Sequence, residues 1–509
     1  MTDMLCRILN RICCLLYSGE YRRFTAPCNV GKVQERYLRE LLCKNADTVY
    51  GRKYGFGSIR SYDDFAADVP LTVYEDYEPY ISAMAQGEDN VLTAERIKLF
   101  ELTSGSSGGK KMIPYTAALK KEFQRGIKPW LYDIYKNVKG ASEGKSYWSI
   151  TPVTAGKTFT QSGIPIGFEE DAEYFGFIEQ RIMRKLFAVD GSVKFSDDME
   201  DFYFRTAKQL INCQELSLIS VWNPTFLTIL CDHIQRNADR LSLTLPEKQR
   251  CDFLEAATEN RFDKIFPRLK IISCWADGSA AAYIEPVKKR FPNVIIQPKG
   301  LLATECFISF PLCNEEGSRL SIYSHFFEFR RISDGIIVTA DRLEKGEYEV
   351  IVTTGGGFYR YCIGDIVEVK EVFENSPPII RFIRRKGIAS DLFGEKLTEE
   401  FVRGVCELLG AANAFSLLAP DGNGYCLYTQ AGGISADMLD NALCESYHYN
   451  YCRQLGQLEK ARVAVICGDP ADAYIKRLSD EGMRIGDIKP AFLSSKSGWG
   501  SYFEIERTE

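Results

Sequence analysis

Histidine is scarce in this chain, with 3 residues in 509, and no Cys-x-x-Cys pair occurs among its 17 cysteines. The spacings typical of zinc sites, thioredoxin-like redox motifs and disulfide frameworks are therefore missing. Because His233, His325 and His448 form no recognisable constellation, the sequence argues against histidine-based catalysis. We expect the chemistry to use lysines, carboxylates and backbone amides. So many unpaired thiols are typical of a reducing compartment, and we predict a cytoplasmic protein.

The chain also lacks an excess of positive charge, since its net charge is −6, whereas nucleic-acid binding depends on basic patches. No run approaches the roughly 18 apolar residues that cross a membrane. Near the start, Leu5, Ile8, Leu9, Ile12 and Leu16 recur at helical spacing. We interpret them as a helix docked on the rest of the fold, and a membrane-surface helix is the alternative. We predict no nucleic-acid partner and no stable membrane association.

What is present is an ordinary globular composition, with 45% hydrophobic and 26% charged residues. In the middle of the chain, strand-like segments at 216–221, 270–275 and 294–297 alternate with helical ones. This order predicts an α/β fold with a parallel or mixed sheet flanked by helices.

A hairpin-rich part follows, in which residues 348–369 read as two strands joined at Gly355–Gly357. We place a domain boundary after the basic turn at Arg384–Gly387. The prediction is therefore a large N-terminal domain, residues 1–387, and a small α+β C-terminal domain, residues 388–509.

The most specific motif lies between Leu102 and Pro114. It contains Thr103, Ser104, Gly105, Ser106, Ser107, Gly108, Gly109 and Lys110, followed by Lys111. The amides and hydroxyls of such a loop can surround phosphates, and a lysine adds charge. The order of residues does not match a Walker A loop. A strand precedes the loop, and Thr116 can cap a helix after it. The order of residues and the ending Lys111-Met112-Ile113-Pro114 favour a polyphosphate site over a flexible surface loop.

Weaker signals follow along the chain. Glu305 comes after the third strand, where α/β ligand crevices form, and it can hold Mg²⁺, although such a residue is often solvated. Cys306 is more typical of a buried small residue than of a nucleophile. Asp365 after Gly364 suits a ribose diol or an Asx-type turn. Lys489, read by itself, is a surface lysine.

Taken in order, these motifs resemble the adenylate-forming superfamily and, within it, the Gretchen Hagen family of acyl acid–amido synthetases, an auxin-responsive plant family with bacterial members. The matching segments are 47–56, 69–77, 103–109, 220–224, 303–305, 326–329, 359–365 and 396–400. The resemblance implies the adenylate-forming fold, a mobile C-terminal domain, and ATP and Mg²⁺ as cofactors.

The resemblance also implies a role for each matching position. Thr103 to Gly109, with Lys110 or Lys111, resemble the phosphate loop, and Thr304 and Glu305 resemble the pair that binds phosphate and Mg²⁺. Asp365 resembles a ribose ligand, and Arg385 a ribose contact at the hinge. Lys396 and Lys489 resemble the two catalytic lysines of the C-terminal domain, and Lys489 is the better candidate for stabilising adenylation. Cys362 and Ala491 depart from the family pattern, and they bear on substrate specificity.

The reaction implied is activation of a carboxylic acid as acyl-AMP with loss of pyrophosphate, followed by attack of an amino acid amine. The alternatives are an acyl-CoA ligase or acyl-protein synthetase of the same superfamily, and a non-catalytic protein that binds a carboxylate ligand. Phe326, Phe327, Trp222 and Trp275 suggest an aromatic acyl pocket, but such side chains are also typical of a core. The particular acid, the amino acid and the oligomeric state stay open.

Overall fold

The computed structural model describes residues 2–104, 110–150, 158–167, 176–386, 389–390, 392–393, 395, 397–454, 457–483 and 488–508. The chain divides into two compact units. The first contains Met1–Trp222, Leu230–Trp275 and Lys288–Ile383, and the second contains Asn223–Ile229, Ala276–Val287 and Arg384–Glu509. Two short segments from the middle of the chain thus group with its C-terminal part.

A parallel sheet with the strand order β3-β6-β7-β8 lies in the first unit. Its strands are β3 (Lys145–Trp148), β6 (Leu216–Ser220), β7 (Ile271–Cys274) and β8 (Ile295–Pro298). In the parallel register, Ile219 faces Ile272, which faces Ile296. Every residue of β6 and β7 is buried, as expected for strands covered on both faces. The α/β pattern predicted for this part of the chain is confirmed.

A seven-stranded sheet, in the order β11-β12-β17-β16-β15-β13-β14, forms the hairpin-rich part. Its strands are β11 (Ser309–Phe310), β12 (Ser318–Leu320), β13 (Phe326–Arg331), β14 (Ile337–Thr339), β15 (Gly346–Thr353), β16 (Tyr361–Phe373) and β17 (Ser376–Arg385). Strands β15 and β16 are antiparallel, and the turn before Phe358 includes Gly357 at φ +101°. A residue with a side chain rarely adopts that conformation, so the predicted glycine turn is confirmed.

Two smaller sheets complete the strands of the first unit. One has the order β2-β1-β5-β4 and the other pairs β10 with β9. Their strands are β1 (Leu99–Ser104), β2 (Lys110–Tyr115), β4 (Thr158–Phe159), β5 (Pro165–Ile166), β9 (Leu302–Ala303) and β10 (Cys306–Phe307). Strand β2 follows the predicted phosphate loop, so a hairpin rather than a direct strand-to-helix connection holds that loop.

Several helices of the first unit begin at a side-chain cap, such as Thr116, whose side chain accepts the Leu119 amide at the start of α6. They are α1 (Thr2–Thr25), α2 (Val30–Lys44), α3 (Val49–Lys53), α4 (Tyr62–Asp68), α5 (Glu78–Ala85), α6 (Ala117–Asn137), α7 (Phe177–Leu186), α8 (Met199–Ile211), α10 (Ala238–Ser242), α11 (Glu247–Thr258) and α12 (Phe262–Ile265). Helices α9 (Pro224–Arg236) and α13 (Ile284–Arg290) run across the division between the units. Short 3₁₀ helices cover Tyr74–Asp76, Ala141–Glu143, Gly191–Phe195, Gly278–Tyr283, Ala340–Arg342 and Trp499–Ser501.

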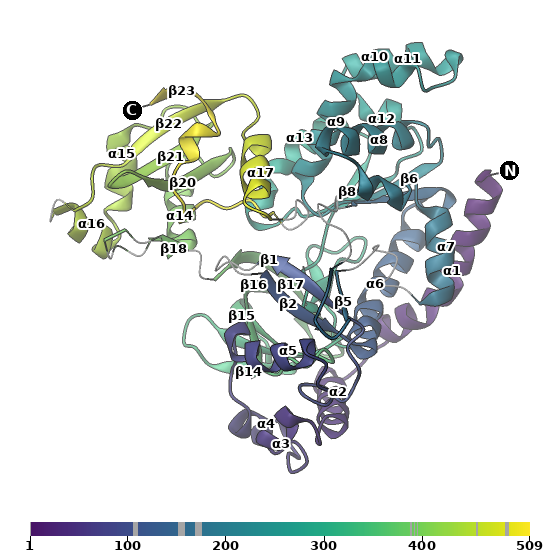
Figure 1. The fold of residues 1–509 in the computed structure, drawn as a ribbon, viewed down its shortest axis with the longest axis vertical. Coiled ribbons are helices and arrows are strands. Elements are labelled where there is room, and N and C mark those ends of the chain that lie inside the picture. The colour runs from purple at the N-terminus through teal and green to yellow at the C-terminus, as the bar shows by residue number, and fades with distance from the viewer. Residues whose placement is uncertain are drawn as a thin grey trace. The chain divides into compact units, whose positions relative to one another are not determined.

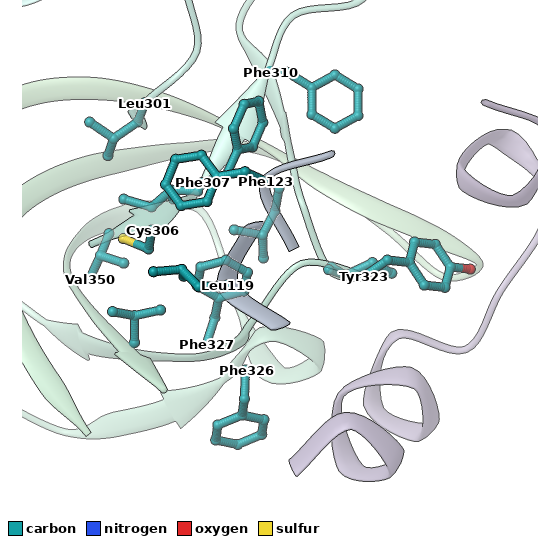
Figure 2. Close-up of a cluster of buried hydrophobic side chains, with 14 of the residues drawn as sticks. Leu119, Phe123, Leu301, Cys306, Phe307, Phe310, Tyr323, Phe326, Phe327 and Val350 are labelled. Atoms are coloured by element: carbon teal, nitrogen blue, oxygen red, sulfur yellow. The ribbon is translucent and has the colours of Figure 1, made fainter. Parts of the chain in front are cut away.

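Helix α6 supplies much of the main hydrophobic core. Its apolar face is buried, and Figure 2 shows Leu119 and Phe123 beside Cys306 and Phe307. The rings of Phe123 and Phe307 meet edge to face at 6.0 Å. Phe326 and Phe327 are also buried in this cluster. The sequence left open whether these phenylalanines line an acyl pocket or belong to a core, and the structure places them in the core.

Helix α1 packs against α6 and α7, as Figure 1 shows, so the predicted docking helix is present. Of the five predicted residues, Leu9 packs against the core, but the other four do not lie on the docked face. The buried residues are Cys6, Cys13, Tyr17 and Phe24, whereas Leu5, Ile8, Ile12 and Leu16 are exposed. No helix in the described ranges is both long and apolar enough to cross a membrane.

The second unit is a small α+β body built on a sheet with the order β20-β21-β22-β23. Its strands are β18 (Ala389–Ser390), β19 (Leu397–Thr398), β20 (Ser416–Asp421), β21 (Gly424–Thr429), β22 (Arg462–Cys467) and β23 (Glu504–Thr508), and its helices are α14 (Glu399–Leu408), α15 (Ala436–Leu443), α16 (Tyr447–Gln454) and α17 (Pro470–Asp480). Asn223 joins this unit by donating its side-chain amide to the Ile488 carbonyl at 2.9 Å.

Candidate active site

The hairpin of β1 and β2 brackets the glycine- and hydroxyl-rich segment. In its register Thr103 lies opposite Lys111 and Ser104 opposite Lys110. Gly105, Ser106, Ser107, Gly108 and Gly109 lie outside the described residues, as do the side chains of Thr103, Ser104 and Lys110. The described backbone therefore fixes where the segment starts and where it ends.

Thr304 and Glu305 form the two-residue turn of a second hairpin, because Ala303 pairs with Cys306. The Tyr115 hydroxyl, at the end of β2, donates to the Thr304 carbonyl at 2.7 Å. This bond ties the Glu305 turn to the hairpin that holds the predicted phosphate loop. Glu305 is only 6% exposed, which excludes the alternative that it is a solvated surface residue.

Asp365 is also buried, at 2% exposure, and it lies within β16 rather than in a turn. Ile351 pairs with Cys362 whereas Glu349 pairs with Ile366, so residues 363–365 bulge from the strand. Gly364 has φ +80° at this bulge. Bulges reorient the side chains next to them, and here the bulge replaces the Asx-type turn that the sequence left open.

Glu305 and Asp365 both lie close enough to Cys306 for their charges to act on its thiol. Burial raises the pKa of the Cys306 thiol well above its usual value, and the charges of Glu305 and Asp365 raise it further. The thiol therefore stays protonated, and it is a poor nucleophile. The reading of Cys306 as a buried small residue holds.

Two side chains near Glu305, the tyrosines Tyr361 and Tyr74, were not singled out from the sequence as site residues. The Tyr361 hydroxyl donates to Glu305 Oε1 at 3.3 Å. Burial raises the pKa of Tyr74, with a contribution from the charge of Glu305. The Lys111 ammonium lies 5.0 Å from the centre of the Tyr74 ring, a cation–π distance. Lys111 thus has a described place in this cluster. The tyrosines stand inside matching motifs, which is the signal that could have found them.

Arg360 looks like a candidate for phosphate binding but is engaged by the protein. Its guanidinium donates to both oxygens of Glu328, at 2.9 to 3.1 Å, and to the carbonyls of Ala66 and Val69 at 2.8 Å. Its backbone has φ +49°, a strained value for a side-chain-bearing residue. Arg360 therefore anchors the start of β16, just before the bulge that carries Asp365.

An aromatic pocket adjoins the Glu305 hairpin within the first unit. It is lined by Phe123, Ile127, Trp130, Trp148, Trp222, Lys299, Gly300, Leu302, Phe307, Ser309, Phe310 and Pro311. Leu302 belongs to β9 and Phe307 to β10. Phe307 follows Glu305 by two residues, so the pocket wall lies within about 7 Å of Glu305 along the chain. Trp222 lines the pocket, and Trp275 packs against it at 6.0 Å between ring centres.

Lys299 is the charged residue among the described lining residues. Its ammonium lies 5.0 Å from the Trp130 ring and 4.9 Å from the Trp222 ring, and it donates to Ser220 Oγ at 2.8 Å. Such contacts fix a cation in place at low entropic cost. The pocket thus combines an apolar, aromatic wall with one positioned positive charge.

The predicted lysines and the hinge arginine fall in the second unit. The backbone carbonyl of Lys489 accepts the Tyr474 hydroxyl at 3.2 Å, which holds this segment on α17. Arg385 is the last residue of β17, and its side chain lies outside the described residues, as does all of Lys396. The structure therefore brings Thr304, Glu305 and Asp365 together in the first unit and assigns Lys489 to the second.

The carboxylates present suit a nucleotide-bound cation better than a resident metal. Within the described ranges, no group of three or more His, Cys, Asp or Glu is arranged to hold a metal ion. Mg²⁺ bound with a nucleotide takes one or two carboxylates, and phosphates and water complete its shell. A single buried carboxylate at Glu305, next to the predicted phosphate loop, fits that pattern.

The fold is shared with solved acyl acid amido synthetases. The acyl acid amido synthetase AtGH3.15, solved in complex with 2,4-DB, superposes with a TM-score of 0.80 at 18% identity, covering 98% of this chain and 97% of that one. A second structure of the GH3.15 acyl acid amido synthetase gives 0.77. The expected fold is confirmed.

The family follows from the sequence matches. The model of the GH3 family N-terminal domain matches residues 22–245, and that of the GH3 family central domain matches residues 319–385. Indole-3-acetic acid-amido synthetase GH3.3 of Arabidopsis thaliana is 23% identical over 448 residues, 79% of this chain and 74% of its own length. The 4-substituted benzoates-glutamate ligase GH3.12 of the same plant is 25% identical over 424 residues, 73% and 72%. The chain belongs to the GH3 family, which is the Gretchen Hagen family that its motifs predicted.

Proposed function

We propose that this chain is an ATP-dependent acyl acid–amido synthetase. It activates a carboxylic acid as acyl-AMP, releases pyrophosphate and transfers the acyl group to the amine of an amino acid. The observation that carries the proposal is the pair of buried carboxylates, Glu305 and Asp365, beside the hairpin of the phosphate loop. The named relatives GH3.3 and GH3.12 are both acid–amino acid ligases, which supports the same reaction class.

In this proposal the nucleotide lies along the first unit. Thr103 to Gly109, with Lys110 or Lys111, contact the phosphates, and the described place of Lys111 beside Tyr74 and Glu305 favours it as one of the cations. Thr304 and Glu305 hold phosphate and Mg²⁺, which neutralises phosphate charge when it is bound. Asp365 accepts hydrogen bonds from the ribose, with Arg385 as a second ribose contact. Catalysis then rests on positioning and electrostatic stabilisation of the charged transition state.

The second unit supplies the lysines. We assign stabilisation of the adenylation transition state to Lys489 and a second catalytic role to Lys396. For these groups to act in turn, residues 388–509 move as a domain against residues 1–387. Such a movement excludes water from the acyl-adenylate and then admits the amine. The 17 free thiols suit a reducing cytoplasm as the place of the reaction.

The acid in this proposal is aromatic, or at least broad and apolar. Six of the 12 residues that line the pocket are aromatic, and two others are Ile127 and Leu302. Ligand pockets typically combine such a wall with a few polar groups that set orientation. Lys299 provides a positive charge that attracts the carboxylate of the acid. The pocket meets the Glu305 hairpin at Leu302 and Phe307, which supports a position for the acid beside the nucleotide.

The first experiment measures acid-dependent ATP–pyrophosphate exchange with a panel of aromatic and aliphatic acids. We expect exchange with aromatic acids, and we expect Lys299→Met to raise KM for the acid at least about tenfold, because a charge-assisted contact is lost. Lys248→Met, at an exposed lysine, is the matched control and should leave KM unchanged. Exchange that depends on no acid would contradict the adenylation step.

A second experiment identifies the acceptor. The acyl-adenylate is formed with the best acid, and CoA or mixed amino acids are then added separately. Mass spectrometry of the products should show an acyl-amino acid and no acyl-CoA. Formation of acyl-CoA without an amide would instead favour the acyl-CoA ligase. Absence of any exchange would favour the non-catalytic carboxylate-binding protein.

A further inference from the structure

Helix α1 has an apolar face that points away from the residues on which it docks. Met4, Leu5, Ile8, Ile12, Leu15 and Leu16 keep between 38% and 75% of their surface exposed. At 3.6 residues per turn, these six positions fall within an arc of about 120° around the helix axis. They lie opposite the buried side of the helix. Contiguous exposed apolar patches of this kind mark interaction sites.

The docked side of α1 is held firmly, so the helix cannot turn to bury its outer face. The buried Asn10 side chain donates to the Gly144 carbonyl at 2.8 Å. Cys13 and Tyr17 are fully buried, and the Phe24 ring packs on Phe310 at 4.5 Å between ring centres. The exposed apolar arc is therefore a feature of the folded protein.

Arginines border the same arc. Arg11 lies on one flank, and Arg22 and Arg23 extend the arc toward the C-terminal end of the helix. Helix α1 contains four arginines and two acidic residues, whereas the whole chain has a net charge of −6. Arg7 pairs with Glu143 at 3.1 Å and Arg23 with Glu20 at 3.9 Å, so Arg11 and Arg22 are the arginines of the helix that carry the exposed positive charge. A basic helix with one apolar face is typical of helices that lie in the interface of a bilayer.

We propose that α1 docks this protein on the surface of an anionic phospholipid membrane. The six apolar side chains enter the boundary between headgroups and acyl chains, and the arginines contact lipid phosphates. Charge complementarity favours this occupant over a second copy of the chain, because two copies of α1 would bring net positive helices together. One amphipathic helix gives reversible binding. The sequence left a membrane-surface helix as the alternative, and the exposed apolar face of α1 favours that alternative.

The test is co-sedimentation of the full chain with vesicles of phosphatidylcholine alone or with 30% phosphatidylglycerol. We expect binding to the anionic vesicles that falls as salt is raised, because exposed charges are screened. The variant Ile8→Glu/Leu15→Glu should bind at least about tenfold more weakly, since charges at the interface oppose insertion. Leu243→Glu and Leu408→Glu, at residues 69% and 74% exposed outside α1, are matched controls that should bind as the wild type does.

Circular dichroism and ATP–pyrophosphate exchange show whether the variants stay folded, and neither should change. If a variant does not fold, Arg11→Glu with Arg22→Glu tests the same surface through its charge. Equal binding by the wild type and the α1 variants, or no binding to anionic vesicles, would overturn the proposal. It would also fail if sedimentation velocity showed a wild-type dimer that Ile8→Glu/Leu15→Glu dissociates, without vesicle binding.

Discussion

The imidazole Nδ1 of His325 lies 3.1 Å from Oε2 of Glu122, and both side chains are buried in the first unit. His325 Nε2 accepts the Phe307 amide at 2.9 Å, so the ring proton of the neutral form sits on Nδ1, the ring nitrogen near the carboxylate. Glu122 belongs to α6, which follows the phosphate-loop hairpin, and Phe307 belongs to β10, which follows Glu305. This contact therefore links the two hairpins of the candidate site through the core.

Glu122→Gln should destabilise the first unit. The Glu122 carboxylate accepts the Tyr37 hydroxyl at 2.7 Å and the Gly355 amide at 3.0 Å, and an amide side chain turns one of these acceptors into a donor. Leaving buried donors unpaired costs on the order of 2–3 kcal/mol. Urea unfolding followed by tryptophan fluorescence measures it, because four of the five tryptophans lie in this unit. Glu247→Gln, at an exposed position, is the control, and equal midpoints for both variants would contradict the role of Glu122.

Asp365→Ala should weaken ATP binding while the protein stays folded. If Asp365 accepts hydrogen bonds from the ribose, losing them costs on the order of 1.5–3 kcal/mol, or roughly 10- to 150-fold in Kd. Titration calorimetry with ATP gives the affinity directly. Glu371→Ala, an exposed carboxylate of the same strand, is the matched control. Unchanged affinity in folded Asp365→Ala protein would remove this residue from the nucleotide site.

Lys489→Ala should abolish adenylation and leave ATP binding nearly intact. A lysine that meets the phosphates only in the transition state contributes to kcat rather than to ground-state affinity. Losing one such electrostatic contact typically lowers kcat about 10²- to 10³-fold. Pyrophosphate exchange measures kcat, and calorimetry measures ATP binding in parallel. Lys496→Ala, in the same unit and 55% exposed, serves as control, and wild-type exchange in Lys489→Ala would refute the assignment.

The second unit should lose stability as the pH rises from about 4.5 to 7. Burial raises the pKa of Glu399 from 4.5 to about 7, against the opposing effect of the Phe492 amide that donates to its carboxylate. The folded state favours the protonated form of Glu399. The stability that this preference contributes is fully present below the pKa of the unfolded state, and it is lost as the pH rises through the pKa of the folded state. The loss is on the order of 2 kcal/mol.

Glu399→Gln checks this expectation because it imitates the protonated form. The variant should be more stable than the wild type at pH 8, and its own stability should vary less between pH 4.5 and 7. Denaturant unfolding followed by the signal of Trp499, which lies in this unit, provides the measurement. Glu445→Gln, at an exposed residue of the unit, should keep the wild-type pH dependence. Parallel pH profiles for the wild type and Glu399→Gln would contradict the raised pKa.

The sequence by itself determined three of the four strands of the parallel sheet (β6, β7 and β8), the Thr116 cap and the family. These follow from local signals: apolar runs, a capping side chain next to the amides it caps, and motifs in a fixed order. Glu305 and Asp365 were also found in this way, through the motifs that contain them. Two neighbours of Glu305 were not, because Tyr74 and Tyr361 come from segments far from it in the chain and meet it only after folding.

Burial was likewise decided by the tertiary structure. Asp365 is buried because a bulge in β16 turns it inward, and no local pattern signals a bulge whose partner strand is not yet known. Helix α1 gives the clearest case. Its periodicity predicted a helix with an apolar face, yet the fold covers the side of Cys6, Cys13 and Tyr17 and leaves Leu5, Ile8 and Ile12 exposed. A helical repeat defines faces along one segment, but which face is buried depends on the shape and contacts that the rest of the chain offers it.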